Sequence, residues 1–507
     1  MNIIAIRRSV VLLSAIFLAA PLAHATGMGA DDARYLLTRT GFAPDPAEIA
    51  EFAALTREQA VDRILSGTRT QPVTAYPDDL NNFIAGKQIR TMSRQQRREL
   101  IRTQLREGGT ELRAWWLGEM LHTPSPLTER MTLFWHNHFV SSQQKVRSPK
   151  LMLNQNLLLR EDAVGNFGKM LHAVSKDPAM VIYLDSASNR KGQPNENFAR
   201  EVMELFTLGE GHYTEDDIKQ AARAFTGWSI DRDTGQFVFR RKVHDGGIKT
   251  VFGKSGDFDG DDVLDLLLAR RETSEFIVGK LWREFVSPQP DAPAVQKIAA
   301  TFRDQNYEIK PVLRQLFLSD AFWAPETRGA IVKSPVDVVV GSLRSLDADV
   351  PDAMPFVRTL KQLGQDIFAP PNVKGWPGGD TWINTATLLE RKQYLDRIAR
   401  ADDATRQMAA QRIGDAMSAR AAAIANGSTS APISGEESKD MMANAKRMEA
   451  AIRNMDIDIP AWTQSVDHAG FTAETALLAV APVEKNDVVA GNNKVRALLL
   501  DPSYEVK

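Results

Sequence analysis

The segment that most constrains the fold spans residues 195–211 and has the pattern of one amphipathic helix. Pro194 and Asn195 provide a start signal and an N-cap, and Gly209 and Gly211 end the run after about three to four turns. Successive residues lie about 100° apart around a helix, so one arc is polar and the opposite arc is apolar. The apolar arc contains Phe198, Val202, Leu205 and Phe206. The polar arc contains Glu196, Asn197, Arg200, Glu201 and Glu204.

This polar row has two interpretations. In the first, Glu196, Arg200 and Glu204 form i,i+4 ion pairs on a solvated face, each worth about 0.2–0.5 kcal/mol. In the second, Glu201 and Glu204 point into a cleft as metal ligands or as a catalytic acid–base pair, and Arg200 binds an anion or orients the carboxylates. Spacing alone favours the first interpretation, because charged rows on helices are usually solvated.

Residues 195–209 read NENFAREVMELFTLG, which resembles the signature of the DUF1800 family of bacterial proteins. The main difference is Val202, where the family usually has Leu. Further family motifs follow in order: LLTRTGF (36–42), FWHNHF (134–139), HDGGIK (244–249), VKSPV (332–336), PPNVKGWPGG (370–379) and LLLDPSY (498–504). The chain is therefore identified as a member of this family over nearly its whole mature length.

The resemblance implies no particular reaction. The family is named for lacking an established biochemical role, and no catalytic residues can be carried over from it. Its genes often lie beside those of the sulfatase-like DUF1501 family, which implies a shared exported process. A DUF1501 protein is therefore a candidate partner.

The first 25 residues have the pattern of a secretory signal peptide. Arg7 and Arg8 precede an apolar run at residues 10–20, and the small-x-small sequence Ala23-His24-Ala25 follows as a cleavage site. The two arginines also leave a twin-arginine route open, although the strongly apolar run favours ordinary secretion. We expect a mature protein at 26–507, located in the periplasm or secreted.

The amino-acid composition excludes several kinds of functional site. The chain has no cysteine, which excludes disulfides, thiolate metal sites and cysteine nucleophiles. Any metal must be held by histidine, carboxylate or amide groups. The formal net charge is −2, and it becomes two units more negative when the signal peptide is removed. A negative chain is unlike a general polyanion binder, and the charge gives no indication of nucleic-acid binding. No stretch after residue 25 is long and apolar enough to span a membrane.

Two histidines lie near the end of a predicted helix that starts at Ser125 and Pro126 and runs to Phe139. His136 and His138 would lie about 200° apart if the helix continues through them, so they could not both bind one metal. We expect one imidazole in a functional site and the other satisfied by packing or by a backbone carbonyl. The candidate ligands of a divalent metal are His136, His138, Glu201 and Glu204.

Residues 236–241 and 249–252 predict a β-hairpin whose connection contains His244 and Asp245. Both are candidate catalytic residues, because two following glycines permit close backbone approach. The alternative is a tight loop in which Asp245 caps its own backbone.

A Pro/Gly-rich loop at 369–380 presents Trp376, with Trp382 close behind. These rings could stack on a sugar or seal a cleft, although such a loop is also a good structural corner. Trp376 and Trp382, together with Asn195 and Asn197, are the candidate substrate-binding residues.

The expected fold is mainly α, one large helical domain with a small β-hairpin insertion and a flexible excursion at 425–440. Two functions remain open. The first is an exported enzyme, a hydrolase or lyase acting on a cell-surface or extracellular polymer, with its cleft where the 195–211 helix meets the two histidine segments. The second is a non-catalytic binding or assembly protein, in which the polar row is a buried network sealed by Trp135 and Trp376.

Overall fold

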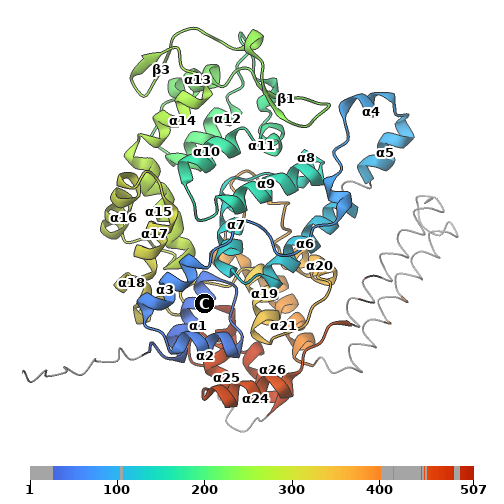
Figure 1. The fold of residues 1–507 in the computed structure, drawn as a ribbon, viewed down its shortest axis with the longest axis vertical. Coiled ribbons are helices and arrows are strands. Elements are labelled where there is room, and N and C mark those ends of the chain that lie inside the picture. The colour runs from blue at the N-terminus through green and yellow to red at the C-terminus, as the bar shows by residue number, and fades with distance from the viewer. Residues whose placement is uncertain are drawn as a thin grey trace, which may run out of the picture.

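Helices make up most of the regular structure in the computed structural model of the chain, which confirms the expected mainly α fold (Figure 1). The structure describes residues 27–102, 107–400, 454–484 and 491–507 and the single positions 411, 415, 447 and 450. The predicted signal peptide at 1–25 and the predicted excursion at 425–440 lie outside the described residues.

The helices divide into three groups along the chain. The first group is α1 (Ala30–Thr40), α2 (Pro46–Ala53), α3 (Arg57–Ser66), α4 (Gly86–Thr91), α5 (Arg94–Arg102), α6 (Gly109–His122), α7 (Pro126–His138), α8 (Gln143–Val146) and α9 (Pro149–Glu161). The second is α10 (Phe167–Ser175), α11 (Pro178–Tyr183), α12 (Asn197–Glu201), α13 (Glu215–Ala224), α14 (Gly260–Leu268), α15 (Arg271–Phe285), α16 (Ala292–Asp304), α17 (Ile309–Phe317) and α18 (Asp320–Trp323). The third is α19 (Pro335–Ser345), α20 (Met354–Gln362), α21 (Thr385–Ala399), α24 (Ile459–Ala469), α25 (Ala473–Leu477) and α26 (Asn492–Leu500).

Helix α7 lies near the middle of the long axis in Figure 1. Helices α12–α14 and the strands lie at one end, and α24–α26 lie at the other. Elements far apart in sequence are neighbours at the second end, where α2 packs against α24 and α1 packs against α25. Within the part of the chain that the structure describes, no helix is long and apolar enough to cross a membrane.

The central helix predicted at 195–211 forms with a different geometry in its second half. Helix α12 continues directly into a π-helical segment, η4 (Val202–Thr207), in which Leu208 N donates to Met203 O at 2.8 Å. Such wider turns are rare and frequently occur at functional sites. Because the turn widens after residue 201, the later polar side chains do not continue the arc of the earlier ones. The predicted apolar side is buried at Phe198 and Phe206.

The strands differ from the predicted hairpin. Strand β1 (Trp228–Ile230) pairs with β2 (Phe237–Phe239), and β3 (Lys249–Val251) pairs with β4 (Lys254–Gly256). The prediction that 236–241 pairs with 249–252 is therefore wrong, and the described residues contain two short hairpins. The physical reason lies at Phe252 and Gly253, which both have positive φ and so form the tight two-residue turn that returns β3 onto β4.

The core holds α7 through buried polar contacts as well as apolar packing. Arg160 binds Glu129 with Nε to Oε1 at 2.6 Å and Nη2 to Oε2 at 2.8 Å, and Trp116 Nε1 also donates to Oε2 at 2.8 Å. Arg130 pairs with Asp337 on α19. Because these charged groups are fully buried and mutually satisfied, they fix the position of α7 and of its last residues, which reach the candidate site.

Candidate functional site

A cleft of about 740 Å³ opens beside the C-terminal end of α7. Its walls come from α7, from α15, from residues 330–337 and from the Pro/Gly-rich loop before α21. The aromatic side chains of its lining are Phe134, Trp376 and Trp382. The charged side chains are Arg130, Lys280, Arg283, Lys374 and Lys507 and the carboxylates Glu284, Asp337 and Asp380. The described cleft therefore combines an aromatic wall with an excess of cations.

The contact between His138 and Lys280 is the most specific polar feature of the cleft. His138 Nε2 lies 3.1 Å from Phe206 O, and Lys280 Nζ lies 2.9 Å from His138 Nδ1. A carbonyl oxygen can only accept, so Nε2 carries the ring hydrogen and the Nδ1 lone pair accepts from Lys280. Lys280 Nζ also donates to Leu205 O at 3.4 Å. Both carbonyls come from the end of η4, where a helix leaves its last C=O groups without helical partners.

Lys280 and Arg283 have no carboxylate partner among the described residues. Arg283 lies three residues after Lys280 on α15 and lines the same cleft. Within the described parts of the chain its one hydrogen bond is to Gly279 O, at 3.4 Å. Burial and the neighbouring Arg283 charge lower the pKa of Lys280 to about 8. Burial and the Lys280 charge lower the pKa of His138 well below its usual value, so its imidazole is neutral at pH 7. The cleft thus holds a lysine that loses its proton readily beside a guanidinium that has no carboxylate partner among the described residues.

The loop that closes one side of the cleft is fixed to α7 by Asn137. Asn137 Oδ1 accepts from Trp376 N at 2.7 Å, and Asn137 Nδ2 donates to Trp376 O at 3.3 Å. Lys374, two residues earlier in the same loop, forms an ion pair with Glu210, with Lys374 Nζ 3.3 Å from Glu210 Oε1. Trp376 is only 5% exposed and Trp382 only 8%, so both rings are parts of the wall and not open stacking platforms.

Comparison with known protein families shows the family of this chain. A family model described as a protein of unknown function, DUF1800, matches residues 35–480. The chain belongs to the DUF1800 family. No curated protein and no solved structure matches it. The matched residues include α7, η4, α15 and the closing loop, and the family description names no activity.

In this DUF1800 protein the two predicted catalytic glutamates lie outside the lining of the cleft. Glu204 accepts from Tyr213 Oη at 2.7 Å and lies 3.8 Å from Lys374 Nζ. Burial and the neighbouring Glu204 raise the pKa of Glu201. Lys374 therefore connects this pair of glutamates to the cleft, because it contacts Glu204 and also lines the cavity.

The remaining polar residues of the central helix are satisfied locally. Arg200 pairs with Glu215 at 2.8 Å and with Glu196 at 3.4 Å, as a solvated ion pair would. Asn195 Oδ1 accepts from Asn197 N at 3.0 Å, and Asn197 Nδ2 donates to Leu184 O at 3.2 Å. None of the three polar residues Asn195, Asn197 and Arg200 lines the described cleft.

The predicted metal ligands do not gather around one position. No three histidine, aspartate or glutamate side chains of the described residues could hold a metal ion together. His138 is engaged by Lys280 and Phe206 O, whereas His136 packs among the rings of Trp116, Phe368 and Trp376 at centroid distances of 5.4, 5.2 and 5.8 Å. His138 lines the cleft and His136 does not, and the predicted ligands His136, His138, Glu201 and Glu204 do not gather into a metal site among the described residues.

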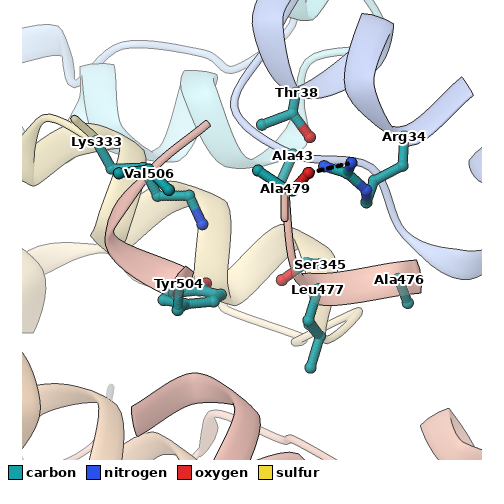
Figure 2. Close-up of a pocket in the computed structure, with 10 residues that line it drawn as sticks. All are labelled: Arg34, Thr38, Ala43, Lys333, Ser345, Ala476, Leu477, Ala479, Tyr504 and Val506. Carbon is teal, nitrogen blue, oxygen red and sulfur yellow. Dashed lines mark hydrogen bonds between the residues drawn. The ribbon is translucent and has the colours of Figure 1, made fainter. Parts of the chain in front are cut away.

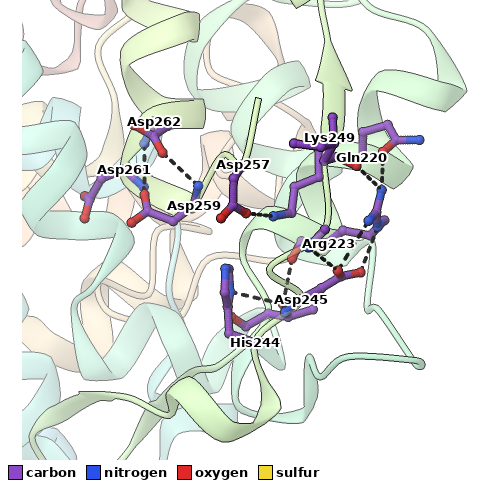
Figure 3. A network of polar contacts seen from close by, with 12 residues as sticks. Gln220, Arg223, His244, Asp245, Lys249, Asp257, Asp259, Asp261 and Asp262 are labelled. Atoms are coloured by element: carbon purple, nitrogen blue, oxygen red, sulfur yellow. Dashed lines mark hydrogen bonds and ion pairs between the residues drawn. The ribbon is translucent and has the colours of Figure 1, made fainter. Parts of the chain in front are cut away.

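His244 and Asp245 lie in a separate polar network (Figure 3). Asp245 Oδ2 accepts from Arg223 Nε at 2.8 Å, and its Oδ1 accepts from Gly247 N at 3.0 Å. The Arg223 hydrogen bond lowers the pKa of Asp245 to about 2. His244 Nδ1 bonds to Thr226 O at 2.8 Å. Asp245 therefore caps its own backbone, and neither residue lines the cleft.

A second pocket, shown in Figure 2, is too small for a substrate. It has a volume of about 10 Å³, which is room for about one water molecule. Lys333 Nζ lies 3.5 Å from the centre of the Tyr504 ring, and Arg34 Nη2 donates to Ala479 O at 3.5 Å. The first contact joins the segment before α19 to residues 502–505, and the second joins α1 to the segment after α25, so both have a structural role.

Sequence reasoning missed Lys280 and Arg283. The signal that could have found Lys280 is its isolation within the apolar run FIVGKLW at residues 276–282. A single cation on an otherwise buried side of a helix needs a partner or a function.

Proposed function

We propose that this protein is an exported acid–base enzyme, of the lyase or hydrolase type, that acts on an anionic cell-surface or extracellular polymer in the 740 Å³ cleft. The observation that carries the proposal is the hydrogen bond between Lys280 and His138 in the cleft wall. An amine whose pKa lies near 8 can both take and return a proton close to neutral pH, which is what general acid–base catalysis requires.

In this proposal Lys280 and Arg283 contact the substrate, and His138 positions Lys280. Lys280 is the catalytic residue, since it lines the cleft and leaves one position of Nζ available after its bonds to His138 and Leu205 O. His138 is a positioning residue, because its neutral ring offers one fixed lone pair that orients the amine. Arg283 would bind an anionic group of the substrate.

The net charge of the chain does not itself favour an anionic polymer. A formal charge of −2 gives no long-range attraction to polyanions. Recognition would instead come from Arg283 and Lys280, which have no carboxylate partner among the described residues, and from the aromatic wall at Phe134. Such a cleft would bind a specific anionic unit and not a polyanion in general.

Export is supported by the N-terminal pattern of Arg7 and Arg8, the apolar run at 10–20 and the cleavage sequence at 23–25. The mature enzyme would then meet its polymer in the periplasm or outside the cell. Amino-terminal sequencing of the protein recovered from the periplasm tests this, with Thr26 expected as the first residue.

A non-catalytic role as the binding or assembly partner of a sulfatase-like DUF1501 protein is the alternative. Two observations favour it: Arg200 is occupied by ion pairs at the surface, and Trp135 and Trp376 are buried. Under this alternative the polar contacts around η4 rigidify the fold and perform no chemistry.

The test measures new reducing ends released from polygalacturonate, hyaluronan, dextran sulfate and neutral dextran. We expect at least one anionic polymer to be cut, with Lys280→Met slowing the reaction by about 10²–10⁴-fold. Lys310→Met, an exposed lysine on α17, is the matched control and should leave the rate unchanged. Undiminished cutting by Lys280→Met would refute the proposed site. Failure to cut any polymer, together with stable binding of a purified DUF1501 protein, would support the alternative.

A further inference from the structure

We infer that the polymer is a polyuronate and that the enzyme cleaves it by β-elimination, with Lys280 as the base and Arg283 as the group that binds the uronate carboxylate. This inference rests on the proposed function of the cleft. It names the substrate class and selects the lyase reaction over hydrolysis.

The bonds of Lys280 favour its action as a base. Two of its N–H groups point to acceptors, His138 Nδ1 at 2.9 Å and Leu205 O at 3.4 Å. In the neutral amine those two hydrogens remain bonded and the third position becomes a lone pair. Because Lys280 lines the cleft, that lone pair is available to a bound substrate. The neutral amine is therefore oriented by the same contacts that hold the ammonium.

The position of Arg283 favours a substrate carboxylate. A C–H bond next to a carboxylate becomes acidic enough to lose its proton only when the negative charge is neutralised. Arg283 follows Lys280 by one helical turn, lines the same cleft and has no carboxylate partner among the described residues. A guanidinium binds a carboxylate through two parallel N–H bonds. A uronate held on Arg283 would thus present its α-carbon on the side of the helix where Lys280 lies.

The carboxylates of the cleft do not suit glycoside hydrolysis, which uses a pair of carboxyl groups with different protonation. Asp337 is bound by Arg130 and by Lys507 Nζ at 2.9 Å, and these two cations outweigh its burial and hold its pKa well below the usual value. Glu284 lies 3.4 Å from Arg130. Both acids are thus occupied by cations. The third carboxylate of the described cleft, Asp380, is exposed and has no second unoccupied carboxyl group beside it in the lining, so the cleft lacks the pair that hydrolysis needs.

The proposed step is balanced without a cofactor. The Lys280 amine takes the proton from the carbon that bears the carboxylate, and the C–H electron pair forms a C=C bond to the next carbon. The C–O bond from that carbon to the leaving sugar breaks, and its electron pair stays on the oxygen. The Lys280 ammonium then protonates this oxygen and the amine is restored. One chain becomes two, and one of them ends in an unsaturated uronate.

The experiment follows ultraviolet absorbance of the conjugated double bond and new reducing ends together, in the same reaction. The substrates are polygalacturonate, alginate, hyaluronan, the carboxyl-reduced form of each, and dextran sulfate. We expect one double bond for each new reducing end from a polyuronate, and no reaction with the carboxyl-reduced forms or with dextran sulfate. Reducing ends without double bonds would overturn the elimination while leaving the proposed enzyme intact. Cutting of dextran sulfate alone would overturn the uronate assignment.

Substitutions at Lys280 and at Arg283 test the role of each residue separately. Arg283→Met should lower the rate on the polyuronate by about 100-fold or more, while Arg358→Met, an exposed arginine on α20, should leave it unchanged. Lys280→Arg keeps the positive charge but cannot supply a neutral base, so it should bind the polymer and not cut it. Elimination that persists in Lys280→Arg would overturn the assignment of the base. Absence of both binding and cutting in the parent protein would overturn the proposed function and the inference together.

Discussion

The side-chain amide of Asn137 binds both backbone polar groups of Trp376, accepting from its N–H at 2.7 Å and donating to its carbonyl at 3.3 Å. Asn137 belongs to α7, which the Glu129–Arg160 pair holds in the core. Trp376 belongs to the loop that forms the opposite wall of the cleft. This one amide therefore joins the two walls, and the shape of the cleft depends on it.

Replacing Asn137 with Asp should loosen the loop. The carboxylate can still accept from Trp376 N, but it cannot donate to Trp376 O and is repelled by it. We expect a loss of about 1–3 kcal/mol in the free energy of unfolding and faster hydrogen exchange at the Trp376 amide. Asn372→Asp is the control, because Asn372 is exposed in the same loop and its Oδ1 only accepts, from Lys374 N. Equal exchange rates in the two variants would contradict the role of Asn137.

Gly375→Ala should disturb the same connection through sterics. Gly375 has φ +81°, and an added Cβ would lie 2.2 Å from Asn137 Oδ1 and 2.7 Å from Asn137 O. We expect a loss of more than about 2 kcal/mol, since the strained φ alone costs about 1–2 kcal/mol. Gly379→Ala is a matched control with φ +58° and nothing within 4 Å of the added Cβ, so it reports the cost of φ alone. Urea unfolding of both variants measures the difference.

Local sequence signals predicted the helices well because they depend on neighbouring residues. Ser125 and Pro126 marked the start of α7, and Phe198, Val202 and Phe206 of the 195–211 segment are buried as their spacing indicated. The pairing of β2 and β3 was predicted wrongly because two positive φ values at 252–253 create a turn that no Asn-Gly or Asp-Gly signal announced.

The site itself could be predicted only in part, because it depends on contacts between distant segments. His138 was a candidate from its position near the end of a helix. Its tautomer and its partner depend on η4 and α15, which meet α7 only in the folded chain. Glu201 and Glu204 drew attention through spacing, yet both lie outside the lining of the cleft, and Glu204 is bound by Tyr213.

Lys280 should react as an amine at a lower pH than other lysines. Its pKa of about 8, against an ordinary value of 10.5, makes the neutral fraction at pH 8 roughly a hundredfold larger than that of a solvated lysine. We expect acylation of Lys280, followed by peptide mass spectrometry, to reach half its maximal rate near pH 8. Arg283→Met should move this midpoint upward, because it removes the neighbouring charge. A midpoint near 10.5 in the parent protein would contradict the site.

The same lowered pKa has a consequence for stability. Between about pH 8 and 10.5 the unfolded chain carries a proton on Lys280 that the folded chain has lost, so the free energy of unfolding should rise with pH across this window. Lys280→Met should lack that part of the slope. Lys310→Met, at an exposed position, should keep it.

Breaking the buried pair beneath the site should be far more costly than breaking a surface pair. Glu129→Gln removes the charge that faces Arg160, whose side chain is 0% exposed, and leaves that cation uncompensated. We expect a loss of about 3–5 kcal/mol in the free energy of unfolding. Glu275→Gln breaks the partly exposed i,i+4 pair with Arg271 and should cost at most about 1 kcal/mol. Similar losses in the two variants would mean that Arg160 finds another partner.

His136 should make the protein sensitive to acid. Burial and the nearby Arg113 charge lower its pKa to about 3, whereas the unfolded value is 6.5. Between those values the unfolded chain binds a proton that the folded chain does not, so stability should fall as pH drops from about 6.5 toward 3, by up to about 1.4 kcal/mol per pH unit. The His136 Nε2 atom has no hydrogen-bond partner among the residues that the structure describes, so His136→Leu loses no polar contact there.

His136→Leu should therefore reduce the slope of unfolding free energy against pH between 6 and 4.5. His138 also has a lowered pKa and should supply a second, similar part of the slope, so the variant should keep a portion of it. His468→Leu replaces an exposed histidine and should leave the slope unchanged, which separates burial from a general effect of histidine number. If His136→Leu has the slope of the parent protein, His136 is protonated in the folded state, and the ring cluster around it must admit a counter-charge or water.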